Sequence, residues 1–327
     1  MCLRGFAICL LLFVHVAPSH GCVSDGRYIM GTVLEITLCD QNLRSPQQTF
    51  DSLFASAAQL DTMLSTFLPE SAISFLNAHA GQGDFSTPPE VVSLLHLSQR
   101  YWRLTQGTFD ATVGPLLQLW SNAQKTQTLP SPPQLQHARM LVGSDKVKIL
   151  PNGHIAFTRP GMIVNVGGIG KGYALDLMVR QSTKNALLNF GQSSVWALGA
   201  PPDAPRWRLL IQQPDGRQVG VIALHNQALS ISSSFGQSFT INGRTYGHII
   251  DPRNGMPLQQ DRLACIVAPS ATLAEALSKA LLILGEHKGL DLLQHLPGVE
   301  GLLIAADGQQ WSTNGWNQAT AFTTDVH

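Results

Sequence analysis

The chain has 327 residues, equal numbers of basic and acidic side chains, and a formal net charge of zero. Its pI near 7.2 leaves no charge excess that would suggest nucleic acid or an anionic membrane surface as a partner. Hydrophobic residues make up 44% and charged residues 13%, so the chain can bury a substantial core, as one large domain or two intimate ones.

Residues 1–21 are typical of an export signal. Arg4 lies near the start, an apolar run extends over residues 6–16, and small residues follow before a polar segment. The run is shorter than the roughly 20 residues that cross a bilayer. We therefore expect an exported mature chain of residues 22–327. Two processing routes stay open: cleavage after Ser19, or lipidation of Cys22 as the first residue of a lipoprotein.

Three cysteines remain once the signal is removed, namely Cys22, Cys39 and Cys265. They allow one disulfide and one leftover thiol, so disulfides do not build the scaffold. If Cys22 carries lipid, Cys39 and Cys265 are the candidate pair. No CxxC motif or Cys/His cluster indicates a zinc site.

The first half of the mature chain mixes extended and helical patterns. Tyr28 to Leu38 is rich in β-branched and aromatic residues and predicts a strand. Residues 46–64 carry apolar side chains at helical spacing, and residues 64–77 are expected to be irregular. A second helix is expected from Pro88 to Gln106, and a short one begins at Pro115.

The second half is richer in β-like patterns. Residues 121–137 contain three prolines and are expected to form a surface excursion. The dipeptide Asn242-Gly243 predicts a tight hairpin, and Ser270 is expected to cap a helix that ends at Gly285. Further short strands are expected at residues 147–149, 155–158, 162–166 and 263–268. About five helices and about ten strands in mixed order favour an α+β fold over a doubly wound parallel sheet.

Ile163 to Ala174 combines a short apolar run, four glycines, one lysine and the opening of a helix. A strand that breaks into glycines and restarts as a helix leaves backbone N–H groups at a positive helix end, which favours an anion such as phosphate. Asn165 and Gly172 break the P-loop pattern around Lys171, and the glycine spacing also excludes the dinucleotide fingerprint. The alternative is a glycine turn between a buried strand and a helix, with Lys171 solvated.

Six stretches occur in an order that is more informative than any one of them. They are Met30-Gly31-Thr32, Leu64 to Phe67 with Leu76-Asn77, Gly107 to Pro115, Gly167 to Tyr173, Tyr246 to Gly255, and Ala268 to Leu281. Together they resemble the ApbE-type FAD:protein FMN transferases over nearly all of the mature chain.

The resemblance implies an α+β fold of mixed β-sheets flanked by helices, T-fold-like and built as a single compact unit. It implies an exported enzyme, in the periplasm or at the periplasmic face of the inner membrane, whose substrate is FAD. Such an enzyme transfers FMN to a threonine or serine hydroxyl of an acceptor protein and releases AMP, with help from Mg2+. The acceptor would be an exported or membrane-anchored flavoprotein. A lipid on Cys22 would be the only membrane anchor.

The resemblance also assigns roles to single residues. Lys171 lies where the family has a lysine near the flavin nucleotide, and the Gly168 carbonyl lies where a backbone oxygen binds the metal. For Met30 and Phe67 the alternative to an FAD contact is core packing. The residues expected to contact FAD are Met30, Phe67, Thr108, Phe109, Asp110, Asn165, Lys171 and Ile249.

His248 and Lys171 are the expected catalytic residues. His248 occupies the place of a family histidine at the reaction site, and an imidazole that titrates near neutrality is a suitable acceptor for a hydroxyl proton. The alternative is a histidine at a strand end that pairs with Asp251. Asp251 itself is expected to shape the turn that follows it.

Three residues depart from the family pattern. Asn165 stands where an aspartate is common, and Glu275 and Lys279 stand where the family places Asp and Thr as metal ligands. Glu275 can still coordinate Mg2+, but a charged Lys279 has no lone pair and would repel the ion. At a spacing of four residues, Glu275 and Lys279 alternatively form an ordinary helical ion pair. We expect the Lys279 ammonium to stand near the metal's place and to contact the phosphates.

These departures keep two alternatives to FMN transfer open. One is hydrolysis of FAD to FMN and AMP, with water in place of the protein hydroxyl. The other is a flavin-binding partner that has no catalytic activity.

Overall fold

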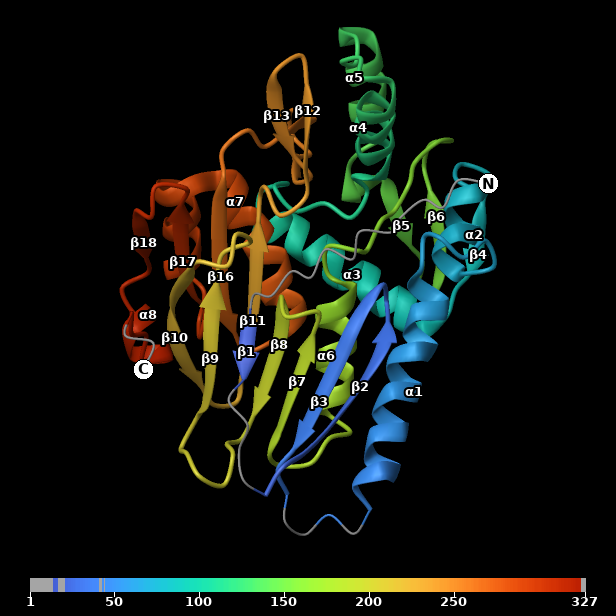
Figure 1. Ribbon diagram of the computed structural model, residues 1–327. Helices are drawn as coiled ribbons and strands as arrows, with labels where there is room; N and C mark the ends of the chain where they lie inside the picture. Colours follow the sequence, from blue (N-terminus) through green and yellow to red (C-terminus); the bar gives the residue numbers. More distant parts are fainter. Residues whose placement is uncertain (1–13, 17–20, 41–42, 44, 325–327) are drawn as a thin grey trace, which may run out of the picture.

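One large antiparallel sheet forms the centre of the protein (Figure 1). The computed structural model describes residues 14–16, 21–40, 43 and 45–324. Eight strands lie in the order β18-β17-β16-β11-β8-β7-β3-β2, and each neighbouring pair is antiparallel. Their bounds are β2 Val23–Ile29, β3 Thr32–Leu38, β7 Ala186–Phe190, β8 Ser194–Leu198, β11 Gln227–Ser233, β16 Arg262–Ala268, β17 Glu300–Ala305 and β18 Gln310–Ser312.

Helices cover one face of this sheet. These are α1 (Pro46–Leu64), α6 (Gly170–Val179) and α7 (Ala271–Gln294), with α3 (Pro89–Leu104) beside them (Figure 1). Side chains alternate between the two faces of a strand, so Leu34 and Ile36 of β3 meet the apolar stripe of α1 in the main core. The expected helix at residues 46–64 is confirmed because its apolar spacing matches this burial.

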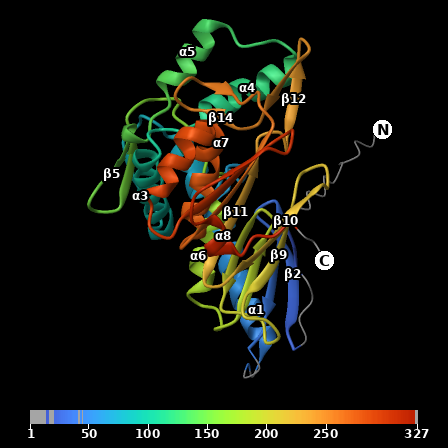
Figure 2. The same cartoon turned by 90° about the vertical axis from the view of Figure 1, so that its left-hand side faces the viewer.

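A second, smaller sheet covers the opposite face (Figure 2). It contains β9 (Trp207–Gln212), β10 (Gln218–Leu224) and β1 (Val14–Val16), which pairs with β9 and falls within the expected export signal. The short helix α8 (Trp316–Thr320) packs beside β10. The layers are therefore sheet, sheet and helix, and the expected α+β class is confirmed.

The remaining elements lie at one end of the sheet (Figure 1). A small sheet in the order β4-β6-β5 packs near α2, while α4, α5 and the hairpin β12-β13 project beyond it. Their bounds are α2 Ala72–Ala78, β4 Asp84–Ser86, α4 Gly114–Thr126, α5 Pro132–Met140, the 3-10 turn η1 Ser144–Lys146, β5 Val147–Ile149, β6 His154–Phe157, β12 Ser238–Ile241, β13 Arg244–Gly247, β14 Ile250–Asp251 and β15 Met256–Pro257.

Several predicted elements of the first half need correction. The single strand expected at residues 28–38 is the hairpin β2-β3, because Met30 and Gly31 adopt positive φ angles of 49° and 76° and reverse the chain. Residues 64–77 are not irregular throughout, since Ser71 accepts a hydrogen bond from the Ser74 N–H and caps α2.

The expected surface excursion at residues 121–137 is also wrong in part. α4 continues to Thr126 and α5 begins at Pro132, so only a short connection remains irregular. Prolines at the start of a helix lack only an N–H that would be unpaired there. By sequence pattern alone the prolines of residues 121–137 indicate a loop, but two of them stand at the start of α5.

The strand expected at residues 162–166 does not form. The segment makes one isolated bridge, from Ile163 to Val113. The backbone N–H and C=O of Val164 instead bond the side-chain amide of Asn77, at 2.8 and 2.9 Å. An asparagine amide thus satisfies backbone groups that a neighbouring strand would otherwise pair.

The last large helix, α7, begins and breaks where the sequence predicts. Ser270 caps α7 as predicted, with its side chain accepting from the Leu273 N–H. Gly285 has a non-helical backbone, with a φ of 75°, and interrupts the helix as expected. A second helical segment follows it to Gln294, so α7 consists of two segments joined by a kink. The hairpin expected at Asn242-Gly243 is confirmed as β12-β13.

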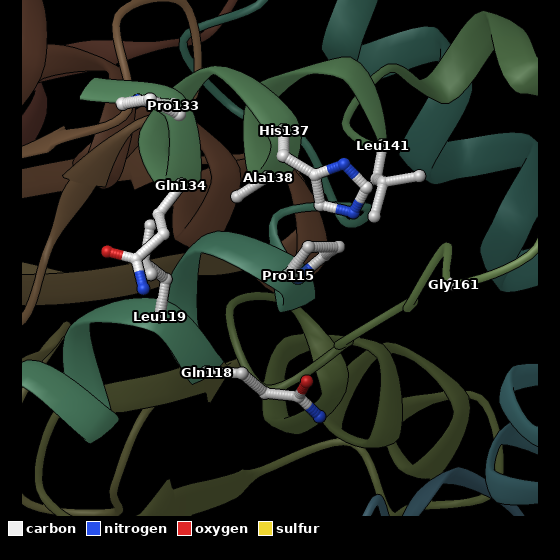
Figure 3. A pocket seen from close by; sticks show the side chains of 9 residues that line it. All are labelled: Pro115, Gln118, Leu119, Pro133, Gln134, His137, Ala138, Leu141 and Gly161. Carbon is white, nitrogen blue, oxygen red and sulfur yellow. The ribbon is translucent and has the colours of Figure 1, made fainter. Parts of the chain in front are cut away.

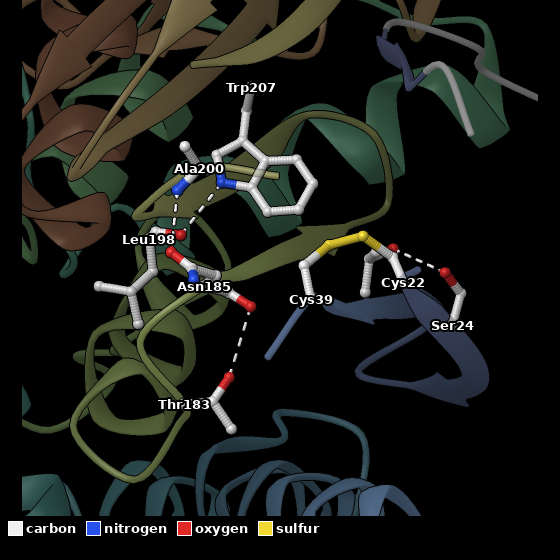
Figure 4. The surroundings of a disulfide bond; sticks show 9 residues. Cys22, Ser24, Cys39, Thr183, Asn185, Leu198, Ala200 and Trp207 are labelled. Carbon is white, nitrogen blue, oxygen red and sulfur yellow. Dashed lines mark hydrogen bonds between the residues drawn. A yellow bond between two sulfur atoms is a disulfide. The ribbon is translucent and has the colours of Figure 1, made fainter. Parts of the chain in front are cut away.

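A disulfide joins Cys22, just before β2, to Cys39, just after β3 (Figure 4). Cys265 is free and buried in the centre of β16. The conditional pairing of Cys39 with Cys265 is therefore wrong. In the described part of the chain, no helix is both long and apolar enough to cross a bilayer.

Candidate active site

The glycine turn leads directly into α6, but the protein uses most of its N–H groups. The Val166 carbonyl accepts from Ile169 at 3.0 Å and from Gly170 at 2.8 Å. The Gly172 N–H donates to Oε2 of Glu275 at 2.8 Å. The expectation of unpaired N–H groups at this helix end is thus wrong for these three residues, and an anion here needs side-chain partners.

Glu275 of α7 forms hydrogen bonds to both α6 and β8. Its side chain is 1% exposed, and its second oxygen, Oε1, accepts from the Ser194 hydroxyl of β8 at 2.5 Å. Gly172 permits this contact because α6 and α7 nearly touch: a Cβ at residue 172 would lie 2.5 Å from the Ala271 carbonyl oxygen. Glu275 is therefore a structural link between α6, α7 and β8.

Asp176 of α6 fixes the start of α7. Its carboxylate accepts from the Ala271 and Thr272 N–H groups at 2.8 and 3.0 Å, and from the Ser270 hydroxyl at 2.7 Å. It also accepts from the indole N–H of Trp196 at 3.0 Å. A carboxylate at a helix N-terminus satisfies unpaired donors and opposes the helix dipole. Asp176 thus anchors the first turn of α7 to α6.

Two lysines face the same cavity. Lys171 donates from Nζ to the Ser193 hydroxyl at 2.7 Å. Lys279, one turn after Glu275, makes no hydrogen bond or ion pair with any residue that the structure describes. The pKa of Lys279 is lowered to about 8, mainly by burial; the negative charge of Glu275 opposes this change, and the positive charge of Lys171 adds to it. The alternative, an ion pair between Glu275 and Lys279, is not among the contacts of the described residues.

His248 lies at the edge of this cavity, directly after β13. Its Nδ1 and its backbone N–H both contact the Gln237 carbonyl, each at 3.0 Å. A carbonyl only accepts, so Nδ1 carries the proton and Nε2 keeps a lone pair. The pKa of His248 is lowered, first by desolvation and also by positive charge on Lys279. The ring is therefore neutral at pH 7 and able to accept a proton.

The alternative partner of His248 is engaged elsewhere. Asp251 forms an ion pair with Arg253 at 2.8 Å and accepts from the Arg253 N–H at 3.0 Å. The Gly255 N–H also closes on the Asp251 carbonyl at 2.8 Å. Asp251 shapes the turn, as expected, and does not pair with the histidine.

Two adjoining cavities meet at this point. One, of about 240 Å³, is mainly apolar; the other, of about 310 Å³, is lined by Lys171, Glu275 and several serines. Both are lined by Gly167, His248, Ile249 and Lys279. The sequence-predicted residues that line at least one cavity are Thr108, Phe109, Asp110, Asn165, Gly168, Lys171, His248, Ile249, Glu275 and Lys279.

Met30 and Phe67 do not line either cavity. Met30 sits in the β2-β3 turn, half-buried against the main core, and its N–H donates to Asp61 at 3.0 Å. The Phe67 ring is 92% exposed, so the core-packing alternative is wrong for this residue. Their contact with FAD stays a prediction.

Asp110 lines the apolar cavity but its carboxylate is already hydrogen-bonded. It accepts from the Thr112 N–H and hydroxyl and from the Ser144 N–H and hydroxyl, at 2.7 to 3.1 Å. Desolvation raises the pKa of Asp110, and these bonds oppose the change. The neighbouring Phe109 ring lies against Gly168. Asp110 therefore organises the loop that presents Phe109 to the cavity.

The residues expected to hold Mg2+ do not suit that ion. Both oxygens of Glu275 accept protein hydrogen bonds, and a charged Lys279 offers no lone pair. The side-chain oxygen of Asn165 accepts from the Gly167 N–H at 2.9 Å. Across residues 21–40 and 45–324, no group of three or more His, Cys, Asp or Glu side chains is arranged to hold a metal. Mg2+ prefers an octahedron of oxygens, which these side chains do not supply.

A different hollow, of about 570 Å³, lies between α4 and α5 (Figure 3). Its wall contains prolines, leucines, two glutamines and His137, with no carboxylate or lysine. It shares no residue with the two cavities at Lys279. It therefore offers no lysine or arginine to a phosphate group, and His137 is its one titratable side chain.

Residues 30–303 match the model of the ApbE family. This chain belongs to the ApbE family. Curated ApbE relatives named FAD:protein FMN transferase include that of Treponema pallidum, 26% identical and covering 93% of this chain and 91% of its own, and that of Haemophilus influenzae, 26% identical and covering 85% of each. The solved flavin transferase ApbE of Vibrio cholerae shares the fold, with a TM-score of 0.81, 22% identity, and coverage of 92% of this chain and 100% of its own.

The ApbE site also contains residues that the sequence did not reveal. Ser193 and Gln237 line the polar cavity and contact Lys171 and His248, respectively. Asp176 lies 95 residues before its partner Ala271. The one local signal is that β8 and β11 carry serines within otherwise apolar, buried strands, where a polar side chain needs a partner.

Proposed function

We propose that this protein is an enzyme that transfers FMN from FAD to a threonine or serine hydroxyl of an exported or membrane-anchored protein, and releases AMP. The observation that supports this most is the convergence of Lys171, Lys279 and a neutral His248 on two joined cavities. FAD has two nucleotide halves joined by a pyrophosphate, and a pair of cavities with cationic side chains at and near their junction suits that shape.

The reaction follows from the groups in place. The acceptor hydroxyl oxygen forms a bond to the phosphorus of the FMN half, and the bond from that phosphorus to the bridging oxygen breaks. The hydroxyl proton passes to Nε2 of His248, which the Gln237 carbonyl keeps in the correct tautomer. AMP leaves with the bridging oxygen, and its added negative charge is stabilised by the nearby ammonium groups.

Hydrolysis of FAD is the second candidate because part of His248 stays accessible to solvent at the cavity edge, although the surrounding protein desolvates its ring. Water at the position of the acceptor hydroxyl would give FMN and AMP from the same groups. A flavin-binding partner without catalysis is the third, because Asn165, Glu275 and Lys279 depart from the family pattern.

One experiment separates the three candidates. The purified protein is incubated with FAD, with and without a candidate acceptor, and followed by in-gel flavin fluorescence and chromatography of nucleotides. We expect covalent flavin on the acceptor and an equal amount of AMP. AMP with free FMN would instead indicate hydrolysis, and bound, unchanged FAD would indicate a non-catalytic protein. His248→Ala should greatly slow product formation. His225→Ala, which changes an exposed histidine away from the cavities, should not.

We also propose an exported protein, in the periplasm or at the periplasmic face of the inner membrane. Support comes from the apolar run at residues 6–16 and from the Cys22–Cys39 disulfide, because disulfides persist in oxidising compartments. The Cys22 sulfur cannot carry a lipid and this disulfide at once. The proposed form therefore has the disulfide and no lipid anchor.

A further inference from the structure

We infer that Lys279 is a fixed cation that binds the pyrophosphate of FAD, so that this protein takes up FAD without a divalent metal ion. This inference rests on the proposed function, because it assumes that FAD is the ligand. It concerns how this chain binds its substrate with a site whose side chains do not suit Mg2+.

Lys279 is placed where the linking group of a two-part ligand would pass. It is one of four residues that line both the apolar and the polar cavity. Whichever nucleotide half occupies each cavity, the pyrophosphate has to lie at the junction. The other junction residues are Gly167, His248 and Ile249, so Lys279 is the one formal cation among the four at neutral pH.

Among the described residues, none accepts a hydrogen bond from the Lys279 ammonium. Neither a hydrogen bond nor an ion pair within 4.0 Å joins it to the described residues. A half-buried ammonium loses hydration, and without a partner this costs free energy. The adjacent acid does not compensate, because Glu275 uses one oxygen for the Gly172 N–H and the other for Ser194. An anionic ligand would complete the bonding of Lys279.

Backbone N–H groups near the junction already have partners, so binding of the pyrophosphate charge there falls to cationic side chains. The N–H group of Gly167, which lines both cavities, already donates to the side-chain oxygen of Asn165. The N–H groups of Gly170 and Gly172, further along the chain, also have protein acceptors. The Asp110 carboxylate in the apolar cavity is held by Thr112 and Ser144. Lys171 supplies a second positive charge at the polar cavity. Two ammonium groups thus match the two negative charges of a pyrophosphate diester.

The test measures FAD affinity in place of turnover. Purified protein is titrated with FAD, followed by flavin fluorescence, once with EDTA and once with excess Mg2+. We expect the two Kd values to agree within about twofold. Lys279→Gln should weaken binding by about tenfold to a hundredfold in both buffers, as for loss of a charge-assisted hydrogen bond. Lys279→Arg, which keeps the charge, should recover most of the affinity.

Lys288→Gln is the matched control. It removes the same charge from an exposed position on the same helix and should leave the Kd unchanged. Thermal melting of each variant identifies any that fails to fold. As an independent measurement, the Mn2+ EPR signal, titrated with protein and FAD together, should match that of FAD alone.

Three results would overturn the inference. The first is native binding that disappears in EDTA and returns with Mg2+, which would leave the proposed function in place. The second is a folded Lys279→Gln variant with native affinity in EDTA. The third is no saturable FAD uptake in either buffer, which would remove the proposed function as well.

Discussion

At the scale of single residues, one backbone carbonyl group determines which nitrogen of the neutral His248 ring carries the proton. The Gln237 carbonyl accepts from Nδ1 and thereby leaves the lone pair of the neutral ring on Nε2. Desolvation and Lys279 keep the ring neutral at pH 7. The reaction proposed for this site needs that neutral ring as the acceptor of the hydroxyl proton.

Replacing His248 should lower the rate of the chemical step more than the affinity for FAD. We expect His248→Ala to slow single-turnover FMN transfer by about a hundredfold to ten-thousandfold, the usual worth of a general base, and to change FAD affinity by only a few fold. Rapid-quench measurement of AMP gives the rate, and fluorescence titration gives the affinity. A variant with native rate would exclude His248 as the base.

The expected pH dependence of the transfer rate follows from the lowered pKa of His248. The active ring is neutral, and its pKa lies below the ordinary value of 6.5. Single-turnover transfer should therefore rise as pH increases through a pKa below 6.5 and be level around pH 7. A profile from pH 4.5 to 8 tests this, and His248→Gln should remove the inflection. An inflection above 6.5 in the native protein would contradict the assignment.

At the scale of elements, the close approach of α6 and α7 positions both lysines. Asp176 of α6 accepts hydrogen bonds from the first turn of α7, and Glu275 of α7 accepts one from the Gly172 N–H of α6. Lys171 and Lys279 project from these two helices toward the same cavity. Any change that separates α6 from α7 should therefore affect stability and FAD binding together.

Two glycines in the first turn of α6 provide a matched pair. A Cβ at Gly172 would lie 2.5 Å from backbone atoms of Ala271, whereas a Cβ at Gly170 would meet nothing within 4 Å. Gly172→Ala should lower the free energy of unfolding by about 1–3 kcal/mol, the cost of overpacking. Gly170→Ala should be neutral or stabilise by up to about 1 kcal/mol, because alanine favours a helix. Urea unfolding of both variants measures the contrast, and equal values would refute it.

The elements also show how far local patterns reach. The hairpin at Asn242-Gly243 and the Ser270 cap were predictable because their signals are local. The strand predicted at residues 162–166 was not formed because Asn77, distant in sequence, takes its backbone bonds. Lys171 and His248 were found through ordered motifs, whereas Asp176 and Ser193 act through tertiary contacts that no spacing in the sequence reveals.

At the scale of the whole molecule, the disulfide secures the sheet edge formed by β2 and β3. Cys22 and Cys39 are 17 residues apart, and closing a loop of that size stabilises a fold by about 3 kcal/mol. Cys265 does not take part: it lies buried in β16, where burial raises the pKa of its thiol. Of the three cysteines Cys22, Cys39 and Cys265, the first two are therefore bonded to each other and the third is a buried thiol.

Thiol counting tests this arrangement. The folded protein should react with no iodoacetamide. After denaturation without reductant, one thiol per processed chain should react, and after reduction three should react. Double substitution of Cys22 and Cys39 by serine should lower the free energy of unfolding by about 3 kcal/mol. Two reactive thiols and a lipid mass on Cys22 would instead establish the lipoprotein route.

The projecting hairpin has one more consequence. Trp120 of α4 lies 5.3 Å, ring to ring, from Tyr246 of β13 and donates from its indole N–H to Gly255 at 2.8 Å. Tyr246 precedes His248 by two residues, so a tryptophan from the first half of the chain helps to aim the imidazole of the second. Evolution can thus retune the turnover of such a protein by repacking an aromatic cluster outside the substrate cavities, leaving every reacting group unchanged.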